Sequence, residues 1–267
     1  MPVKKDASGR RSVQAEVEVP GTPEEVWSAI ATGRGVSSWF VPTDVEERKG
    51  GTITANFGPG MDSLSTITTW DPPQRFSADS QDMGWNAPTV ATEWIVEARS
   101  GGTCVVRVVH SWFADVDDWD DQFEGHEHGW RVVFRILHLY LAHFRGQHGA
   151  VLQLMPAAPE PKQEAWGALK ASLGLTASSI GQRVSASSGA PPLAGVIEYA
   201  GEGELAEELL VRLDAPAPGI AHLFALPMGG QIVLPICLYL YGERAAAVVA
   251  RDKPMWQEHL KAAFLVF

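Results

Sequence analysis

Cysteine is scarce in this 267-residue sequence, and long apolar runs are missing. The two cysteines, Cys104 and Cys237, lie far apart and form no CxxC motif. This argues against a disulfide scaffold or a structural zinc site and predicts two semi-buried thiols in a reducing compartment. No run reaches the ~18 apolar residues that a membrane-spanning helix needs, and no apolar segment follows the basic N-terminus as in a secretory signal. We therefore expect a cytoplasmic protein.

The chain is also short of positive charge. With 21 Lys and Arg against 32 Asp and Glu, its formal net charge is −11. Phosphate backbones and anionic bilayers repel such a chain, so we expect neither nucleic acid nor a membrane as a partner. The motifs GxxxxGK[ST], GxGxxG and GxSxG do not occur. Nucleotide hydrolysis, dinucleotide chemistry and serine-hydrolase action therefore have no motif to support them, and no cofactor is expected.

Apolar residues and tryptophan, in contrast, are plentiful. The chain is 45% hydrophobic, and eight of its ten tryptophans precede residue 150. This composition can form sizeable cores, and the length suggests two domains. A Pro- and Ala-rich linker at residues 151–162 is predicted to separate a domain of residues 12–150 from a smaller one of residues 163–267, after a mobile arm of residues 1–11.

The first half reads as one strand, a short helix and a meander. Residues 13–19 alternate apolar and polar side chains like a half-buried strand, and Thr22 and Pro23 then supply the cap and first residue of a helix. Strand-like runs follow with turn residues but no helices between them, which predicts an antiparallel sheet. These runs are Asp44–Lys49, Thr52–Phe57, Ser63–Trp70, Arg75–Ser80, Thr89–Ala98 and Thr103–Phe113.

From about Asp118 to Gly146 the hydrophobic period changes to that of a long helix. Its main apolar stripe is formed by Phe123, Trp130, Phe134, Leu137, Leu141 and Phe144. Further apolar residues widen this stripe almost right round the helix, so more than one face should be covered. We expect the sheet on one face and the rest of the chain, or a second subunit, on another.

The second half repeats the order helix, strands, helix. The predicted elements are a helix at Glu164–Leu173, strands at Leu193–Tyr199, Leu209–Leu213, Ile220–Leu226, Gln231–Tyr241 and Ala245–Ala250, and a helix at Lys253–Phe264. One interpretation is a truncated second copy of the first half that lacks its first strand. Residues 231–241 are apolar on both faces, which predicts burial on both sides, with Pro235 at a bulge or an unpaired edge position. Docking within the chain, or a homodimer, would supply the cover.

Several segments of the first half resemble a known superfamily. Residues 17–30 (VEVPGTPEEVWSAI) resemble the opening strand and helix of START-like, SRPBCC proteins, and residues 35–40 (GVSSWF) resemble their LxxWF segment. Residues 51–57 (GTITANF) and 70–76 (WDPPQRF) are similar to two strands of the subfamily named after the heat-shock protein 90 ATPase activator. Gly129-Trp130 matches the usual GW of its last helix.

The resemblance covers about residues 12–148. It implies a helix-grip fold, an antiparallel sheet wrapped round a long C-terminal helix, with an apolar cavity that often binds a hydrophobic small molecule. The family has no fixed set of catalytic residues, so none is carried over. The activator itself has another domain that this sequence does not show, which argues against co-chaperone activity.

Charged residues indicate which side chains face such a cavity. Arg107 must face water, which turns His110 and Trp112 inward on their strand, and Glu93 and Glu97 likewise turn Trp94 inward. The ligand-binding candidates are Trp94, His110, Trp112, Trp130, Phe134, Leu137 and Leu141. The alternative is that these large side chains fill the space and leave no cavity.

Other polar groups have simpler interpretations. His110 could act as an acid or base, but an inward histidine is more often a satisfied core residue. The acidic segment at residues 115–124 lacks the glycine of a calcium loop and is best explained as the charged start of the long helix. Glu124, His126, Glu127 and His128 contain no HExxH motif, and no metal site is expected.

The sequence therefore predicts an α+β protein with a helix-grip domain and a smaller α+β domain. Its expected function is non-enzymatic binding of a hydrophobic small molecule by the first domain. A cyclase- or dehydratase-like enzyme that uses the same cavity, and a co-chaperone-like interaction module, are the alternatives.

Overall fold

The computed structural model describes residues 4–5, 9–58, 62–81, 89–113, 120–159, 161–177 and 179–265, with the side chains of the long helix described from Gly129 onward. The chain divides into two compact units, Met1–Gly146 and Gln147–Phe267. Each unit combines antiparallel strands with a few helices, which confirms the predicted α+β class. No helix within the described ranges is long and apolar enough to cross a membrane.

The first unit is built on one eight-stranded sheet with the order β1-β2-β8-β7-β6-β5-β4-β3. Every neighbouring pair is antiparallel, and the early strand β2 pairs with the last strand, β8, so that Glu16 lies opposite Arg107. The strands are β1 (Lys4–Lys5), β2 (Arg10–Pro20), β3 (Thr43–Val45), β4 (Thr52–Asn56), β5 (Asp62–Asp71), β6 (Arg75–Gln81), β7 (Ala91–Arg99) and β8 (Thr103–Phe113).

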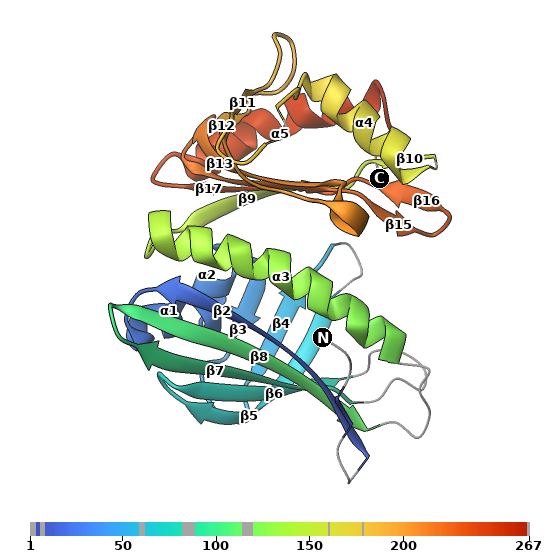
Figure 1. Ribbon diagram of the computed structural model, residues 1–267. Coiled ribbons are helices and arrows are strands. Elements are labelled where there is room, and N and C mark those ends of the chain that lie inside the picture. Colours follow the sequence, from blue (N-terminus) through green and yellow to red (C-terminus); the bar gives the residue numbers. More distant parts are fainter. Residues whose placement is uncertain are drawn as a thin grey trace. The chain divides into compact units, whose positions relative to one another are not determined.

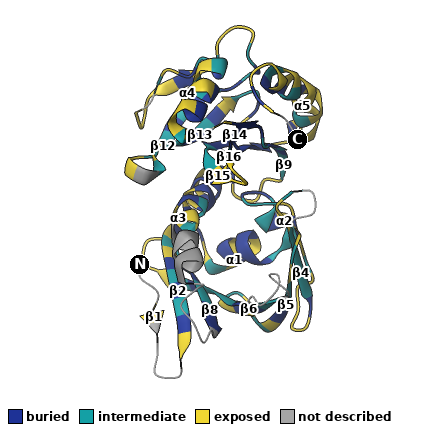
Figure 2. Ribbon diagram, turned by 90° about the vertical axis from the view of Figure 1, so that its right-hand side faces the viewer, coloured by how far each residue is buried: buried dark blue, intermediate teal, exposed yellow. Residues whose placement is uncertain are grey.

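Three helices complete this unit: α1 (Pro23–Ala31), α2 (Gly33–Val36) and α3 (Asp120–His143). Helix α1 starts as predicted, because the Thr22 hydroxyl accepts from the Glu25 amide and the Glu25 carboxylate accepts from the Thr22 amide. Its apolar face is buried (Figure 2). Helix α3 packs on β2 and lies across the sheet (Figure 1), so the helix-grip fold is confirmed.

Parts of the N-terminal segment are described as strand, and the mobility of the arm stays a prediction. Residues 1–11 were predicted as a mobile arm, but Lys4 and Lys5 pair with Ser12 and Arg11, and strand β2 already begins at Arg10. The charged side chains suggested a solvated terminus, whereas the backbone groups of an edge strand can be satisfied by any sequence that lies alongside them.

The second unit has a six-stranded sheet with the order β11-β12-β13-β14-β17-β9, a three-stranded sheet with the order β10-β16-β15, and two helices. The strands are β9 (Gly149–Leu154), β10 (Ala157–Ala158), β11 (Arg183–Ser185), β12 (Ala194–Ala200), β13 (Glu208–Ala215), β14 (Gly219–Phe224), β15 (Leu226–Met228), β16 (Gln231–Val233) and β17 (Ile236–Tyr241). The helices are α4 (Lys162–Leu173) and α5 (Ala245–Lys261), and a 3-10 turn spans Gly203–Leu205.

The predicted linker and the predicted missing strand are both corrected by β9. Residues 149–154 form the first strand of the second unit and pair with its last long strand, β17, as β2 pairs with β8 in the first unit. The second unit therefore begins with a strand, and its interpretation as a second copy of the first unit stays a prediction. The short apolar run at 149–154 directly precedes Pro- and Ala-rich residues, whose composition indicates a linker.

Two further boundaries differ from the prediction. Residues 245–250 (AAAVVA) are the first turns of α5 rather than a strand, since alanine favours helix and the apolar run is too short to reveal its period. The predicted strand at 231–241 is interrupted at Pro235, which separates β16 from β17 because proline cannot donate to a ladder. Within β17, Ile236, Leu238 and Leu240 enter the core of the second unit. The predicted docking of the opposite face of this strand stays a prediction.

Both cysteines are free and buried, as the sequence suggested. Burial raises the pKa of the Cys237 thiol to about 12, and desolvation followed by the charges of Glu24 and Glu25 raises the pKa of Cys104. A raised pKa keeps a thiol in its unreactive protonated form at pH values at which an ordinary cysteine would ionise.

We therefore expect both thiols of the folded protein to resist Ellman's reagent at pH 8, where roughly one Cys237 thiol in 10⁴ is ionised. Absorbance at 412 nm would follow the reaction, and the same assay in guanidinium chloride, which should release both thiols at once, is the control. Rapid reaction of either thiol in the folded protein would contradict the burial.

Candidate functional site

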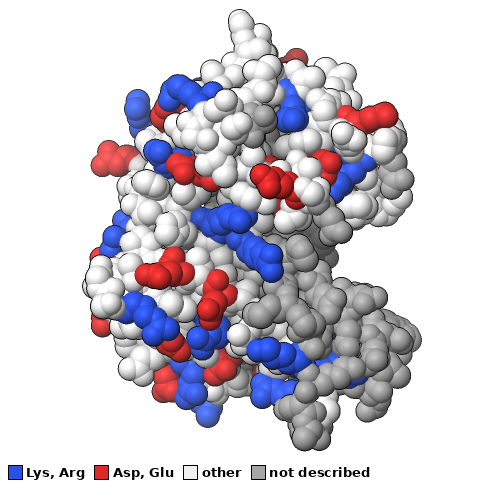
Figure 3. All heavy atoms as spheres, in the orientation of Figure 1, with Lys and Arg blue, Asp and Glu red and all other residues white. Residues whose placement is uncertain are grey.

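Ion pairs fix which face of the first sheet is turned outward. Arg107 of β8 binds Glu16 of β2 at 3.1 Å and Glu97 of β7 at 3.2 Å. Acidic and basic side chains are interspersed over the described part of this unit in Figure 3. Because side chains alternate along a strand, Val106 and Val108, both 0% exposed, lie on the inner face. This inner face forms the wall of the candidate site.

The inner face encloses a cavity of about 770 Å³. Inward residues of strands β3 to β8 line most of it. The rest of the lining comes from α1, from α2 and the turn that follows it, and from Gly129, Trp130 and Val133 within α3. The aromatic part of the lining is Trp39, Phe40, Phe57, Phe76, Trp94 and Trp130. A volume of this size is typical of small-molecule sites.

The aromatic rings are packed against one another in two geometries. Phe40 stacks on Trp130 with ring centroids 6.1 Å apart and planes at 22°, and Phe76 stacks on Trp94 at 6.1 Å and 11°. Trp94 meets Trp130 edge to face at 5.2 Å. Ring faces and edges are thus both presented at the cavity, and either can pack against a flat ligand.

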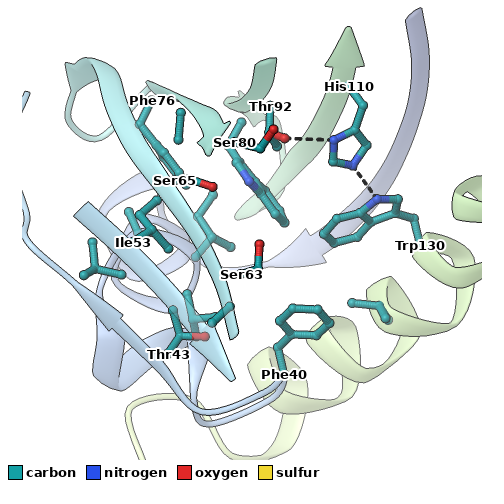
Figure 4. A pocket seen from close by; sticks show the side chains of 18 of the residues that line it. Phe40, Thr43, Ile53, Ser63, Ser65, Phe76, Ser80, Thr92, His110 and Trp130 are labelled. Atoms are coloured by element: carbon teal, nitrogen blue, oxygen red, sulfur yellow. Dashed lines mark hydrogen bonds between the residues drawn. The ribbon is translucent and has the colours of Figure 1, made fainter. Parts of the chain in front are cut away.

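His110 is held by two hydrogen bonds at the edge of the cavity (Figure 4). Trp130 Nε1 donates to His110 Nε2 at 2.7 Å, and His110 Nδ1 lies 2.9 Å from Thr92 Oγ1. Indole nitrogen can only donate, so Nε2 is the unprotonated acceptor and Nδ1 carries the proton that Thr92 accepts. The arrangement therefore specifies a neutral imidazole that fixes the orientation of Trp130.

The part of the cavity lining that the structure describes is uncharged. Among its described residues there is no Asp, Glu, Lys or Arg, and apart from His110 the polar side chains are Thr43, Ser63, Ser65, Ser80, Thr92 and Trp side-chain nitrogens. A buried carboxylate or ammonium without a partner is strongly disfavoured. The cavity therefore suits an uncharged molecule.

The seven candidates from the sequence fall into two groups. Trp94, His110 and Trp130 line the cavity. Trp112, Phe134, Leu137 and Leu141 are at most 2% exposed and form the core beside it. The periodicity of α3 indicated which face of the helix points inward, but not how far along that face the cavity extends.

Most of the lining was not identified from the sequence. Phe40 and Phe57 enter from the connection after α2 and from the end of β4, while Ser63, Ser65 and Ser80 enter from β5 and β6. Strand alternation could have grouped Ser63 with Ser65, but β5 carries no charged residue in its middle to mark the outer face. The serines would then have been assigned to solvent.

Metal binding has no support among the described residues, which contain no group of three or more His, Cys, Asp or Glu able to hold an ion. Residues 115–119 of the acidic segment lie outside what the structure describes, as do the side chains of residues 120–124 and those of His126, Glu127 and His128. His138 of α3 hydrogen-bonds through Nδ1 to the backbone oxygen of Glu18 at 3.0 Å.

The comparison with protein families agrees with the fold of the first unit. Residues 20–142 match the family described as Activator of Hsp90 ATPase homolog 1-like protein. The resemblance predicted over residues 12–148 is thereby confirmed. No curated protein matches the sequence.

Similar solved structures cover either about half of this chain or nearly all of it. The di-domain ARO/CYC BexL from the BE-7585A biosynthetic pathway is 14% identical, with a TM-score of 0.46 over 95% of this chain and 93% of its own. DynU16, a putative protein in the dynemicin biosynthetic locus, is 16% identical, with a TM-score of 0.43 over 94% and 97%. The Aha1 dimer from Colwellia psychrerythraea is 19% identical, with a TM-score of 0.42 over 51% and 98%.

Proposed function

We propose, from the premise that the first unit is an Activator of Hsp90 ATPase homolog 1-like domain, that this protein binds an uncharged hydrophobic small molecule without converting it. The observation that carries the proposal is the cavity of about 770 Å³, whose lining is aromatic and uncharged among the residues that the structure describes. Cavities of ~300–1,000 Å³ with mostly apolar walls and a few polar groups are how proteins hold such ligands.

The alternative that large side chains fill the unit is less well supported. Trp112, Phe134, Leu137 and Leu141 do fill their region, but the space between α3 and strands β3 to β7 stays open. The space is open to its surroundings on one side and walled mostly by apolar side chains, so an apolar molecule can enter and pack there.

An enzyme is the second candidate, because His110 is a titratable side chain at the cavity. In the structure Nε2 accepts from Trp130 and Nδ1 donates to Thr92, so acid–base chemistry would first have to break one of these bonds. No carboxylate among the described lining residues could orient the imidazole for that task. These features favour a positioning role for His110 and a binding role for the cavity.

The proposal is tested by titration with the neutral fluorescent probe N-phenyl-1-naphthylamine. We expect its emission to rise in a saturable way with micromolar affinity and tryptophan emission to fall, because Trp94 and Trp130 line the cavity. Unlabelled fluorene should displace the probe. No emission change, or a signal that no competitor displaces, would contradict the proposal.

Conversion of a ligand can be checked separately. A bound ligand that is incubated for a long time with the protein and then extracted should be recovered with unchanged mass and chromatographic retention. A dehydratase would instead remove one water from the ligand, and a cyclase would change its retention. The same extraction from His110→Gln protein is the control, since an enzyme that uses His110 would lose the conversion in that variant. A cytoplasmic location, a homodimer and a co-chaperone-like role stay predictions.

A further inference from the structure

Four hydroxyl groups are collected on one wall of the otherwise apolar cavity. They belong to Ser63 and Ser65 of β5, Ser80 of β6 and Thr92 of β7. Ser65 lies directly opposite Ser80 in the sheet, and Thr92 lies opposite Ala78, one step diagonally from Ser80. We call these four residues the hydroxyl patch. Figure 4 shows its members projecting into the same cavity as the rings of Phe40 and Trp130.

The two serines of β5 reverse the expected polarity at the start of their strand, although Ile67, farther along the same face, is apolar and buried. A strand with one buried face normally turns its apolar residues inward and its serines to water. In β5 the serines at 63 and 65 point into the cavity, while Leu64 between them is 39% exposed on the outer face. Reversals of this kind are expected at functional sites rather than in packed cores. The reversed pattern therefore indicates that the hydroxyls serve a ligand.

The hydrogen bonds of the patch leave donors available. Ser80 Oγ accepts from the Val90 amide at 2.9 Å, and Thr92 Oγ1 accepts the Nδ1 proton of His110. Each of these hydroxyls keeps its own proton to donate. The structure records no hydrogen bond to the side chains of Ser63 and Ser65 within the described part of the chain. The patch thus presents donors to whatever occupies the cavity.

The spacing of the patch limits the ligand further. Ser63 and Ser65 are two residues apart on one face of a strand, which separates their hydroxyls by roughly 6–7 Å. Directly opposed residues such as Ser65 and Ser80 have Cβ atoms about 5 Å apart. A flat molecule that packs on the aromatic rings could therefore meet several of these donors along one edge. A carboxylate or phosphate would lack a cationic partner among the described lining residues.

We infer that the hydroxyl patch selects an uncharged, flat ring compound that carries carbonyl or ether oxygens along one edge. This rests on the proposed binding function and adds the chemistry of the ligand to it. The hydroxyls donate to the ligand oxygens, while the opposite side of the ligand packs on Phe40 and Trp130. Alkyl chains and unsubstituted ring hydrocarbons enter the same cavity but leave these donors unpaired.

The test compares fluorene with 9-fluorenone, whose main difference is a carbonyl oxygen, in the purified full chain. Tryptophan quenching gives both Kd values, and their ratio isolates the carbonyl. Wild-type protein should prefer fluorenone over fluorene, and Ser65→Ala/Ser80→Ala should reduce that preference by about 10-fold, since one neutral hydrogen bond contributes roughly 3- to 10-fold. Affinity for fluorene should change by no more than about threefold.

Ser77→Ala is the matched control, because Ser77 lies on β6 but its side chain is on the opposite face from Phe76 and Ala78. Its ratio should equal that of the wild type, and Ser63→Ala, at a separate point of the patch, should lower the ratio as well. Fluorene-2-carboxylate should bind at least about 10-fold more weakly than fluorenone at pH 7. Binding of fluorene and fluorenone with the same ratio in all variants would overturn the hydroxyl patch alone, whereas no binding of either compound to wild-type protein would overturn the binding function itself.

Discussion

Replacing Ala55 with tryptophan (Ala55→Trp) should weaken the binding of N-phenyl-1-naphthylamine by about 10-fold or more. Ala55 lies on β4 opposite Ser63, and its side chain faces the cavity between those of Ile53 and Phe57. An indole at this position would occupy space that the ligand needs, and the strand tolerates it because aromatic residues suit pleated, half-buried positions. Fluorescence titration of the probe measures the loss of affinity.

Thr54→Trp provides the matched control for this substitution. Thr54 directly precedes Ala55 on β4 and points away from the cavity, so its replacement adds similar bulk on the outer face. We expect wild-type affinity for Thr54→Trp and a thermal unfolding midpoint close to wild type for both variants. Equal probe affinity in Ala55→Trp and Thr54→Trp would show that the probe binds elsewhere.

Replacing Leu137 with alanine should have the opposite profile, a large loss of stability with little effect on binding. Leu137 is 0% exposed on α3 and does not line the cavity, although the sequence made it a ligand-binding candidate. Truncation of such a side chain leaves a void and lowers the free energy of unfolding by about 2–5 kcal/mol. Urea unfolding followed by tryptophan emission measures this change.

Arg135→Ala serves as the comparison, because Arg135 is exposed on the same helix and surface substitutions usually change stability by less than about 0.5 kcal/mol. Under conditions where both variants are folded, probe affinity should stay within about threefold of wild type. A Leu137→Ala protein that is stable but binds the probe poorly would restore the sequence-based assignment of Leu137 to the site.

The faces of two strands could be determined from the sequence because charges mark them. Arg107 on β8, and Glu93 and Glu97 on β7, must reach water, and their positions turn Trp94 and His110 toward the cavity. In β5 the charged residues Asp62 and Asp71 stand only at the ends of the strand, and the apolar residue Leu64 lies on the outer face. Hydrophobicity alone therefore assigns Ser63 and Ser65 to solvent, whereas Thr92 is turned inward together with Trp94 by the charges on β7.

The sequence also could not show how far the cavity extends along α3. Trp130 and Leu137 share one apolar stripe of α3, yet Trp130 borders the open space and Leu137 is enclosed in the core. A helical period identifies a face but gives no information on what lies opposite each turn. The run at 149–154 is likewise too short for its own sequence to identify it as a strand. It becomes a strand through its pairing with β17.

The pairing of β2 with β8 affects how the protein folds during its synthesis on the ribosome. Glu16 and Arg107, which meet across these strands, are separated by 91 residues of chain. Closing so long a loop is slow, and sheets with such distant pairings are slow to fold. A nascent chain that ends before Thr103 has made the walls that carry Ser63 and Ser80 but lacks the strand that carries His110 and all of α3. We therefore expect the growing polypeptide to become able to bind a ligand only after residue 143 has emerged from the ribosome. At that stage the second unit is still being translated.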